Sequence, residues 1–369
     1  MRKQEDLGCA KEEVLAQIAK PLLKWYDVHR RVLPWREDPT PYHVWVSEIM
    51  LQQTRVEAVK GYYERFMRQL PDVECLARAQ EDLLLKLWEG LGYYNRIRNM
   101  QKAARTVVAE YGGQLPSDRE QLLSLAGIGS YTAGAISSIA YGKCYPAVDG
   151  NVLRVISRIL TEEQDITKAS FKAQVERSLE KVMPQERPGD FNQAMMDIGA
   201  TVCLPSGGPL CGSCPLQEIC KACQTGTWQR YPVKAPKKQR RIEEKTVLVV
   251  RDKNRVALHK RPDTGLLAGL YEFPLVAGKL TQKEVLAHLK EKGLRALRIR
   301  ELGEAKHVFS HIEWHMIGYH VLVDELEPFD TGRGMDNGAI FVELAKARAE
   351  YAIPSAFAAY TELLWKEGL

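Results

Sequence analysis

The chain has 369 residues, of which 45% are hydrophobic and 27% are charged, and its formal net charge is +5. This composition is typical of a soluble protein with two or three domains. The sequence has no run of about 18 apolar residues that could span a membrane, and the charged segment 1–13 has no apolar signal-peptide core. We therefore expect a cytoplasmic protein without a membrane partner. The basic charge alone is weak evidence for a nucleic-acid partner.

Residues from about 12 to 200 are predicted to form a succession of helices. Apolar side chains recur with helical spacing, for example at Val56, Val59 and Tyr63, and proline or glycine turn signals separate the segments. No strand-like alternation interrupts this part of the sequence.

The composition changes after this helical region. Residues 230–241 contain six basic residues, two prolines and no acid, which predicts a solvated, semi-extended linker. Beyond it, Thr246–Val250 and Val256–Leu258 have the pattern of strands that flank a turn, and Ile312, Trp314 and Met316 alternate with polar residues. The sequence thus predicts an all-α part followed by a separate α+β domain.

One glutamate of the first helices is a candidate acid. Glu48 lies among Trp45, Val46, Ile49 and Met50. Apolar surroundings raise the pKa of a carboxyl group and keep it protonated, so that it can donate a proton to a leaving group. Taken alone, however, a glutamate in a helix is more often exposed to solvent.

A possible helical hairpin follows. Ser117-Asp118-Arg119-Glu120 has the capping-box pattern and predicts a helix that ends near Leu125. Gly127 and Gly129 interrupt it, and a second helix is expected to begin near Tyr131. Two glycines permit a tight turn that brings the N–H groups of the second helix against a phosphate. An ordinary helix corner has the same pattern.

Most cysteines of the chain are concentrated in one short segment. Four thiols at such short spacing suit either an iron–sulfur cluster or a structural zinc ion, and the spacing leaves both open. Cys223 is an alternative to Cys220 as the last ligand. The candidate ligands are Cys203, Cys211, Cys214 and Cys220, whereas the scattered Cys9, Cys75 and Cys144 are expected to be packing residues.

These motifs occur in the order of a known superfamily. Leu33–Arg36, Trp45–Thr54, the hairpin, Val148-Asp149-Gly150-Asn151-Val152 and the four cysteines resemble the helix-hairpin-helix glycosylases, and the first two segments resemble the MutY branch more than the endonuclease III branch. The resemblance covers nearly the full length, except for about ten N-terminal residues. The first cysteine spacing departs from the pattern, with seven residues, Leu204 to Leu210, where the family usually has six.

The resemblance implies a multi-domain fold, a function and a location. We expect an all-α helix-hairpin-helix catalytic region with an iron–sulfur loop over residues 1–228, a basic linker over 229–245, and an α+β Nudix-like domain over 246–369. The implied activity is a monofunctional DNA glycosylase of base excision repair, with a [4Fe-4S] cluster as its cofactor. Its expected partner is double-stranded DNA with adenine opposite 8-oxoguanine or, more weakly, opposite guanine. We expect a monomer at the nucleoid of a bacterial cell.

The resemblance also implies roles for single residues. Glu48 would protonate adenine, and Asp149 would stabilise the positive charge that develops on the deoxyribose, either covalently or only electrostatically. Tyr131 and Asn151 would support these two carboxyl groups. Tyr131 also occupies the position of the lysine nucleophile of bifunctional members, so that no strong lyase activity is expected.

The other implied roles concern adenine, DNA and metal. The adenine pocket would contain Trp35, Arg36 and Gln193, and the wedge that fills the duplex gap would be Gln53 and Tyr93. The residues that face the oxidised guanine would be Thr54, Leu91, Phe309, Ser310 and His311. The hairpin glycines Gly127 and Gly129 would bind the DNA backbone, and the metal ligands would be Cys203, Cys211, Cys214 and Cys220.

The C-terminal region resembles the start of a Nudix-like domain over residues 258–274. A Nudix hydrolase needs a run of glutamates to hold magnesium, but the only acids between Pro274 and Leu294 are Glu284 and Glu291. We therefore expect a recognition domain without hydrolase activity.

Two other functions fit the sequence less well. A pyrimidine-specific enzyme of the endonuclease III type is disfavoured by the missing lysine at Tyr131 and by the additional C-terminal domain. A catalytically inactive DNA-binding or iron–sulfur scaffold protein is disfavoured because Glu48 and Asp149 are both present.

Overall fold

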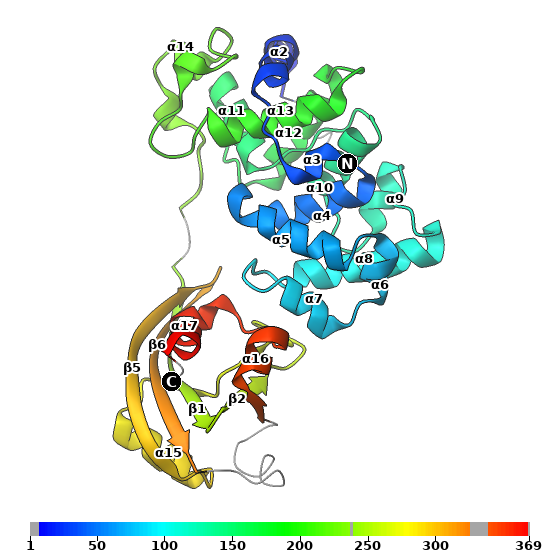
Figure 1. The fold of residues 1–369 in the computed structure, drawn as a ribbon. Coiled ribbons are helices and arrows are strands. Elements are labelled where there is room, and N and C mark those ends of the chain that lie inside the picture. Colours follow the sequence, from blue (N-terminus) through cyan, green and yellow to red (C-terminus); the bar gives the residue numbers. More distant parts are fainter. Residues whose placement is uncertain (1–6, 237–238, 325–338, 368–369) are drawn as a thin grey trace, which may run out of the picture. The chain divides into compact units, whose positions relative to one another are not determined.

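The structure is a computed structural model that describes residues 7–236, 239–324 and 339–367. Residue contacts divide the chain into two compact units (Figure 1), one formed by 1–78 and 98–236 and the other by 79–97 and 237–369. The expected linker contains this boundary, although a strand already begins at Arg241. The expectation of a missing signal peptide rests partly on residues 1–6, which lie outside the described residues.

The described residues of the first unit form helices joined by loops and no strand, as predicted. Its elements are α1 Cys9–Ala16, α2 Ala19–His29, α3 Pro34–Glu37, α4 Pro41–Leu51, α5 Val56–Gln69, α6 Val73–Arg78, most of α8 Asn95–Tyr111, α9 Arg119–Ser124, α10 Ser130–Ala135, the π-helix η1 Ile136–Ala140, α11 Gly150–Leu160, α12 Ala169–Val182, α13 Pro188–Thr201, the 3-10 helix η2 Cys211–Ser213, α14 Lys221–Gln224 and the 3-10 helix η3 Trp228–Arg230.

One apolar core joins α1, α2, α11, α12 and α13, and its fully buried members include Ile156, Phe171 and Phe191. Burial of such side chains is the main source of stability for these short helices, because isolated helices of this length are marginal in water. No described helix of the protein is both long and apolar enough to cross a membrane.

The second unit combines a mixed sheet with helices on both faces. Its elements are α7 Glu81–Leu87, β1 Arg241–Asp252, β2 Arg255–Lys260, β3 Tyr271–Glu272, β4 Leu275–Ala277, α15 Gln282–Glu291, β5 Ala296–Val308, β6 Ile312–Val323, β7 Ile340–Glu343, α16 Leu344–Glu350, the 3-10 helix η4 Ser355–Phe357 and α17 Ala358–Glu367.

The strand order of this sheet is β3-β2-β1-β6-β5, with β4 paired to β1 and β7 paired to β2. Strands β1 and β6 run parallel, while the other pairs are antiparallel. Alternate residues of β1 serve two cores, because Val247 and Val249 pack towards Phe357 and α17, whereas Leu248 and Val250 pack towards Val285 of α15. The predicted strands and the alternation over 312–316 are confirmed.

The hairpin before Tyr131 differs in one detail from the sequence prediction. The N-cap of α9 is Asp118, whose Oδ1 accepts hydrogen bonds from the N–H groups of Glu120 and Gln121, both at 3.0 Å. The capping box that begins at Ser117 is therefore wrong, because the carboxylate one residue later satisfies these helix donors.

The turn of this hairpin depends on one of its two glycines. Gly127 has a φ of +78°, and a Cβ there would lie 2.7 Å from the Cβ of Asn99. Gly129 has an ordinary φ of −98° and serves as the N-cap of α10. Only Gly127 thus needs the conformational freedom of glycine.

Candidate active site

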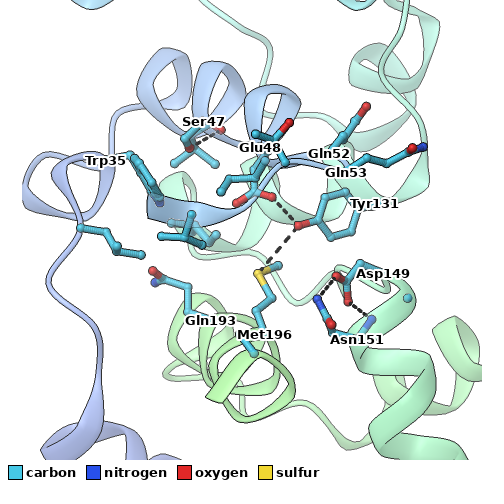
Figure 2. Close-up of a pocket in the computed structure, with 18 of the residues that line it drawn as sticks. Trp35, Ser47, Glu48, Gln52, Gln53, Tyr131, Asp149, Asn151, Gln193 and Met196 are labelled. Carbon is cyan, nitrogen blue, oxygen red and sulfur yellow. Dashed lines mark hydrogen bonds between the residues drawn. The ribbon is translucent and has the colours of Figure 1, made fainter. Parts of the chain in front are cut away.

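A cavity of about 680 Å³ in the helical unit collects most of the residues predicted to act on adenine (Figure 2). It is lined from α3, α4, α10, α11 and α13 and from the segment that follows α4. The predicted residues among its lining are Trp35, Arg36, Glu48, Gln53, Thr54, Tyr131, Asp149, Asn151 and Gln193.

Glu48 is held inside the protein by the character of its helix. Helix α4 begins after the N-cap Thr40, and every residue from Val44 to Met50 is buried. A helix that is apolar on nearly all sides packs in the interior, so Glu48 is carried out of water and only 5% of its surface is exposed. Burial, together with the nearby charge of Asp149, raises the pKa of Glu48 to about 7, although hydrogen bonding to Tyr131 and the charge of Arg36 oppose the shift.

Tyr131 connects the hairpin to this carboxyl group. Its hydroxyl donates a hydrogen bond to Oε2 of Glu48 and lies 3.8 Å from Sδ of Met196 (Figure 2). Burial and the neighbouring carboxyl groups of Glu48 and Asp149 raise the pKa of Tyr131 well above its usual value. The phenol therefore stays a hydrogen-bond donor, which fits the supporting role predicted for it.

Asp149 is the N-cap of α11. Its Oδ1 accepts hydrogen bonds from the N–H groups of Asn151 and Val152 at 2.9 and 2.8 Å, and its Oδ2 accepts one from Nδ2 of Asn151 at 2.8 Å. The positive end of the helix dipole and three donors hold the carboxylate in one orientation. The backbone before it is fixed by a close approach, because a Cβ on Gly134 would lie 2.2 Å from the carbonyl oxygen of Pro146.

A buried ion pair at the cavity was not anticipated from the sequence. Nη1 and Nη2 of Arg36 lie 2.8 and 2.9 Å from the carboxylate of Asp197, and Nε of Arg31 lies 2.8 Å from it. Although burial alone would raise the pKa of Asp197, the two guanidinium groups hold it below its usual value. The two arginines line the cavity, whereas Asp197 of α13 lies behind them and is not part of its lining.

The two predicted wedge residues share an unusual backbone conformation. Gln53 has a φ of +61° and Tyr93 a φ of +48°, whereas most described residues with positive φ are glycines. Residues other than glycine seldom adopt this conformation, and such strain is concentrated at functional positions. Gln53 is exposed, Tyr93 is 51% exposed, and the neighbouring Leu91 is buried.

The loop of Tyr93 has its own internal support. Nη2 of Arg96 donates hydrogen bonds to the carbonyl oxygens of Leu91 and Gly92 at 2.9 and 3.0 Å, and the guanidinium lies over the rings of Trp88 and Tyr93. These contacts fix the strained loop from beneath and leave the Tyr93 ring at the surface.

The remaining predicted contacts to the oxidised base lie in the second unit. Ser310 and His311 form the exposed tip of the β5–β6 hairpin, which is closed by a hydrogen bond from the N–H of Phe309 to the carbonyl of Ile312 at 2.8 Å. The Phe309 ring packs against Trp314 with centroids 5.0 Å apart. In the same unit, the hydroxyl of Tyr93 lies 3.3 Å from Oγ of Ser310. A predicted wedge residue and a residue predicted to face the oxidised guanine are thus neighbours.

Several thiols of the cysteine segment, residues 203–223, lie close enough to influence one another. Burial and the neighbouring thiols of Cys203, Cys220 and Cys211 raise the pKa of Cys214 to about 12, and Cys223 is a hydrogen-bonding neighbour of Cys211. Within the described residues, however, no three or more His, Cys, Asp or Glu side chains are arranged as a metal site. The donor set itself, soft thiols on a short loop, suits iron–sulfur chemistry.

Two arginines of α11 bond to this segment, and one of them, Arg154, also bonds to Asn151. Arg154 donates hydrogen bonds to Oδ1 of Asn151, to the carbonyl of Gly199 and to the carbonyl of Cys203, at 2.9, 2.7 and 2.9 Å. Nη1 of Arg158 lies 3.2 Å from Sγ of Cys203. Helix α11, which Asp149 caps, is therefore hydrogen-bonded to Cys203, the first of the predicted metal ligands.

Two parts of the chain match known families. Residues 46–185 match the HhH-GPD superfamily of base excision DNA repair proteins, and residues 246–363 match the NUDIX domain. Among solved structures, a thermostable thymine-DNA glycosylase is 28% identical with a TM-score of 0.50 over 58% of this chain and 98% of that chain. A non-covalent endonuclease III–DNA complex, at 24% identity with a TM-score of 0.50 over 59% of this chain and 99% of that chain, shares the fold. The fold, with its buried Glu48 and capped Asp149, is that of a DNA N-glycosylase.

Curated relatives narrow this class. The adenine DNA glycosylase of Mus musculus is 36% identical over 92% of this chain and 77% of its own length, and that of Homo sapiens is 37% identical over 84% and 68%. The adenine DNA glycosylase of Buchnera aphidicola subsp. Baizongia pistaciae (strain Bp) is 33% identical over 84% of this chain and 87% of its own length. The chain belongs to the adenine DNA glycosylase family.

Proposed function

We propose that the protein excises adenine that is mispaired with 8-oxoguanine and, more weakly, with guanine. The observation that carries the excision chemistry is the pairing, within one cavity, of a buried carboxyl group with a raised pKa and a capped carboxylate. Glycosidic cleavage needs an acid for the leaving group and an anion for the sugar, and two carboxyl groups in different environments supply these two roles.

The residues of the cavity would have different roles in the reaction. Glu48, which holds its proton near neutral pH, donates it to N7 of the flipped adenine, and Tyr131 orients the carboxyl group by a hydrogen bond. Asp149, fixed by Asn151 and the start of α11, stabilises the oxocarbenium-like sugar as the bond to adenine breaks. The position of Tyr131 holds no amine, so a water molecule rather than a Schiff base would complete the reaction.

Selection of the oxidised partner base would be a separate task of the second unit. The exposed Ser310 at the β5–β6 turn and the half-exposed Tyr93 offer hydroxyl groups 3.3 Å apart. A hydroxyl can donate to or accept from the edge of 8-oxoguanine, which differs from guanine at two adjacent positions. Discrimination is then the difference between the affinity for a duplex with 8-oxoguanine and the affinity for a duplex with guanine. These contacts would strengthen only the first of the two.

The specificity is tested by Ser310→Ala. We expect the ratio of single-turnover excision rates, adenine opposite 8-oxoguanine over adenine opposite guanine, to fall about threefold to tenfold, because one hydrogen bond contributes about 0.5–1.5 kcal/mol. Ser355→Ala, at another exposed serine of the same unit, should leave the ratio unchanged. An unchanged ratio in Ser310→Ala would remove the recognition role of this turn without affecting the excision chemistry.

We further propose that Cys203, Cys211, Cys214 and Cys220 hold a [4Fe-4S] cluster. The spacing after Cys211 supports this set over one that contains Cys223, although Cys223 is a hydrogen-bonding neighbour of Cys211. The cluster would stabilise the cysteine loop, which Arg154 and Arg158 of α11 contact at Cys203.

Metal analysis tests this assignment. The purified protein is expected to contain about four iron atoms and no zinc, with broad visible absorption. Cys220→Ser should lose most of the iron, whereas Cys223→Ser and the exposed Cys9→Ser should retain it. One zinc and no iron would contradict the cluster, and iron loss in Cys223→Ser but not in Cys220→Ser would identify Cys223 as the ligand.

A further inference from the structure

Asp197 bonds to two residues that line the cavity of the helical unit, although it is not part of the lining itself. It lies on α13 and is 0% exposed. Its carboxylate accepts hydrogen bonds from Nε and Nη2 of Arg31 at 2.8 and 2.6 Å, and from Nη1 and Nη2 of Arg36 at 2.8 and 2.9 Å. The backbone N–H of Arg31 also donates to it, at 3.3 Å. A carboxylate that is so deeply buried and so fully engaged can influence the reaction only through the two arginines.

The guanidinium of Arg36 is held in place by more than this ion pair. Its central carbon lies 5.7 Å from the ring centroid of Tyr26, and Nη1 lies 3.3 Å from the carbonyl oxygen of Arg31. Burial alone would lower the pKa of Arg36, but the hydrogen bonds and the charge of Asp197 raise it. Arg36 is therefore a cation whose charge Asp197 balances. Among the described residues, Tyr26 and Arg31 are the other titratable groups that face this pair.

The positive charge of Arg36 also acts on Glu48. Both side chains line the same cavity. Burial raises the pKa of Glu48, whereas the hydrogen bond from Tyr131 and the charge of Arg36 oppose this rise. Tyr131 and Asp149 are the other titratable groups of the described chain that face Glu48 (Figure 2). An opposite charge favours the ionised form of a carboxyl group, and it does so more strongly in a buried site than in water. An Arg36 without its partner would therefore favour loss of the proton from Glu48.

We propose that Asp197 is a positioning residue for adenine excision, which holds and neutralises Arg36 so that this arginine lines the pocket without pairing with Glu48. The glutamic acid then keeps the proton that it gives to adenine. A guanidinium has five N–H donors, so Arg36 can be bonded to Asp197 and still offer a donor to the flipped base. This role of Asp197 rests on the proposed role of Glu48 as the acid, and extends it to a residue outside the cavity.

The pH profile of Asp197→Asn tests this role. In the unmodified protein the single-turnover rate should fall as pH rises through about 7, where Glu48 loses its proton. In Asp197→Asn we expect this fall to begin at least about one pH unit lower, because the unbalanced Arg36 lowers the pKa of Glu48. At pH 8 the variant should then be slower by about tenfold or more, and most of the rate should return at about pH 5. If Asp197 had only a structural role, the rate would fall by the same factor at every pH.

Arg36→Met gives an opposite reading in a protein that keeps Arg31 as the partner of Asp197. Removal of the cation should move the fall to higher pH, whatever the change in overall rate. This variant decides the question even if Asp197→Asn does not fold, which its thermal unfolding midpoint would show. The matched control is Asp190→Asn, the same change on the same helix, where the half-buried carboxylate lies 2.8 Å from Arg187. Its fall should stay at about pH 7.

The outcomes separate this role from the role of Glu48 itself. A fall that disappears in Glu48→Gln but is unmoved in both Asp197→Asn and Arg36→Met would overturn only the role of Asp197. A shift to lower pH in Arg36→Met would overturn it as well, because Arg36 would then not oppose protonation of Glu48. A fall that persists in Glu48→Gln would overturn the proposed acid, and the role of Asp197 with it.

Discussion

Glu48→Gln is expected to abolish adenine excision and to leave binding of the mismatched duplex nearly unchanged. The amide has the shape of the acid and still accepts the hydrogen bond of Tyr131, but it has no proton to give to adenine. General acid catalysis contributes about 10²–10⁴-fold, and adenine is a poor leaving group, so we expect a loss of about a thousandfold or more in the single-turnover rate. Duplex affinity, measured by fluorescence anisotropy, should change less than about threefold.

The matched control is Glu57→Gln, which removes the same charge from an exposed position of α5 and should leave excision unaffected. A Glu48→Gln protein within about tenfold of the original rate, about 1.4 kcal/mol of barrier, would show that another group protonates adenine.

The pH profile gives a second reading of the same residue. Because the folded-state pKa of Glu48 is raised to about 7, the acid form predominates below that pH and is lost above it. The excision rate of the unmodified protein should therefore fall as pH rises through about 7, by about tenfold for each further unit. The residual rate of Glu48→Gln should lack this limb, and a limb that persists in the variant would belong to a different group.

Asp149→Asn is expected to cause a loss of similar size by a different route. The asparagine side chain can still cap α11 through its oxygen, so the helix should remain folded, but the negative charge beneath the sugar is gone. Removal of one well-placed electrostatic contact in a site sheltered from water costs about 4 kcal/mol, about a thousandfold in rate. The single-turnover rate on adenine opposite 8-oxoguanine and the thermal unfolding midpoint are the two measurements.

Asp118→Asn is the control that distinguishes loss of a helix cap from loss of a catalytic charge. Asp118 caps α9 with the same pair of backbone hydrogen bonds, yet it lies outside the described lining of the cavity. Its variant should show a similar change in unfolding midpoint and a nearly normal rate. If Asp149→Asn were slow only in proportion to its loss of stability, the carboxylate would be a structural cap and not part of the chemistry.

The catalytic pair could be predicted because its signals are local. The apolar residues around Glu48 in the sequence predict a buried segment of α4, and Glu48 is buried together with them. Asp149 stands directly before a helical pattern, where a carboxylate serves as N-cap. The helix and strand periods likewise predicted a helical first part and the strands β1, β2 and β6 of the second unit. In each case the evidence lies within a few residues, where chain geometry determines which side chains share a face.

The ion pair of Arg36 with Asp197 could not be predicted in this way. These residues are separated by 161 positions, and their pairing depends on how α3 packs against α13. The backbone of Gln53 also lacks a local signal, because glutamine normally avoids positive φ and only the surrounding packing imposes it. Ser117 and Asp118 show a third limit, since both are good N-caps and the helix selects one by the turn that precedes it.

The left-handed conformations of Gln53 and Tyr93 have a consequence for attempts to stabilise the protein. Each residue other than glycine in this conformation lowers the free energy of unfolding by about 1–3 kcal/mol. That is a large share of a typical free energy of unfolding of about 5–15 kcal/mol. A screen for heat resistance would therefore favour glycine at these positions early, since glycine removes the strain. The same replacement deletes the side chains proposed to fill the gap left by the flipped base. Selection for thermostability and selection for repair would thus act on these two residues in opposite directions.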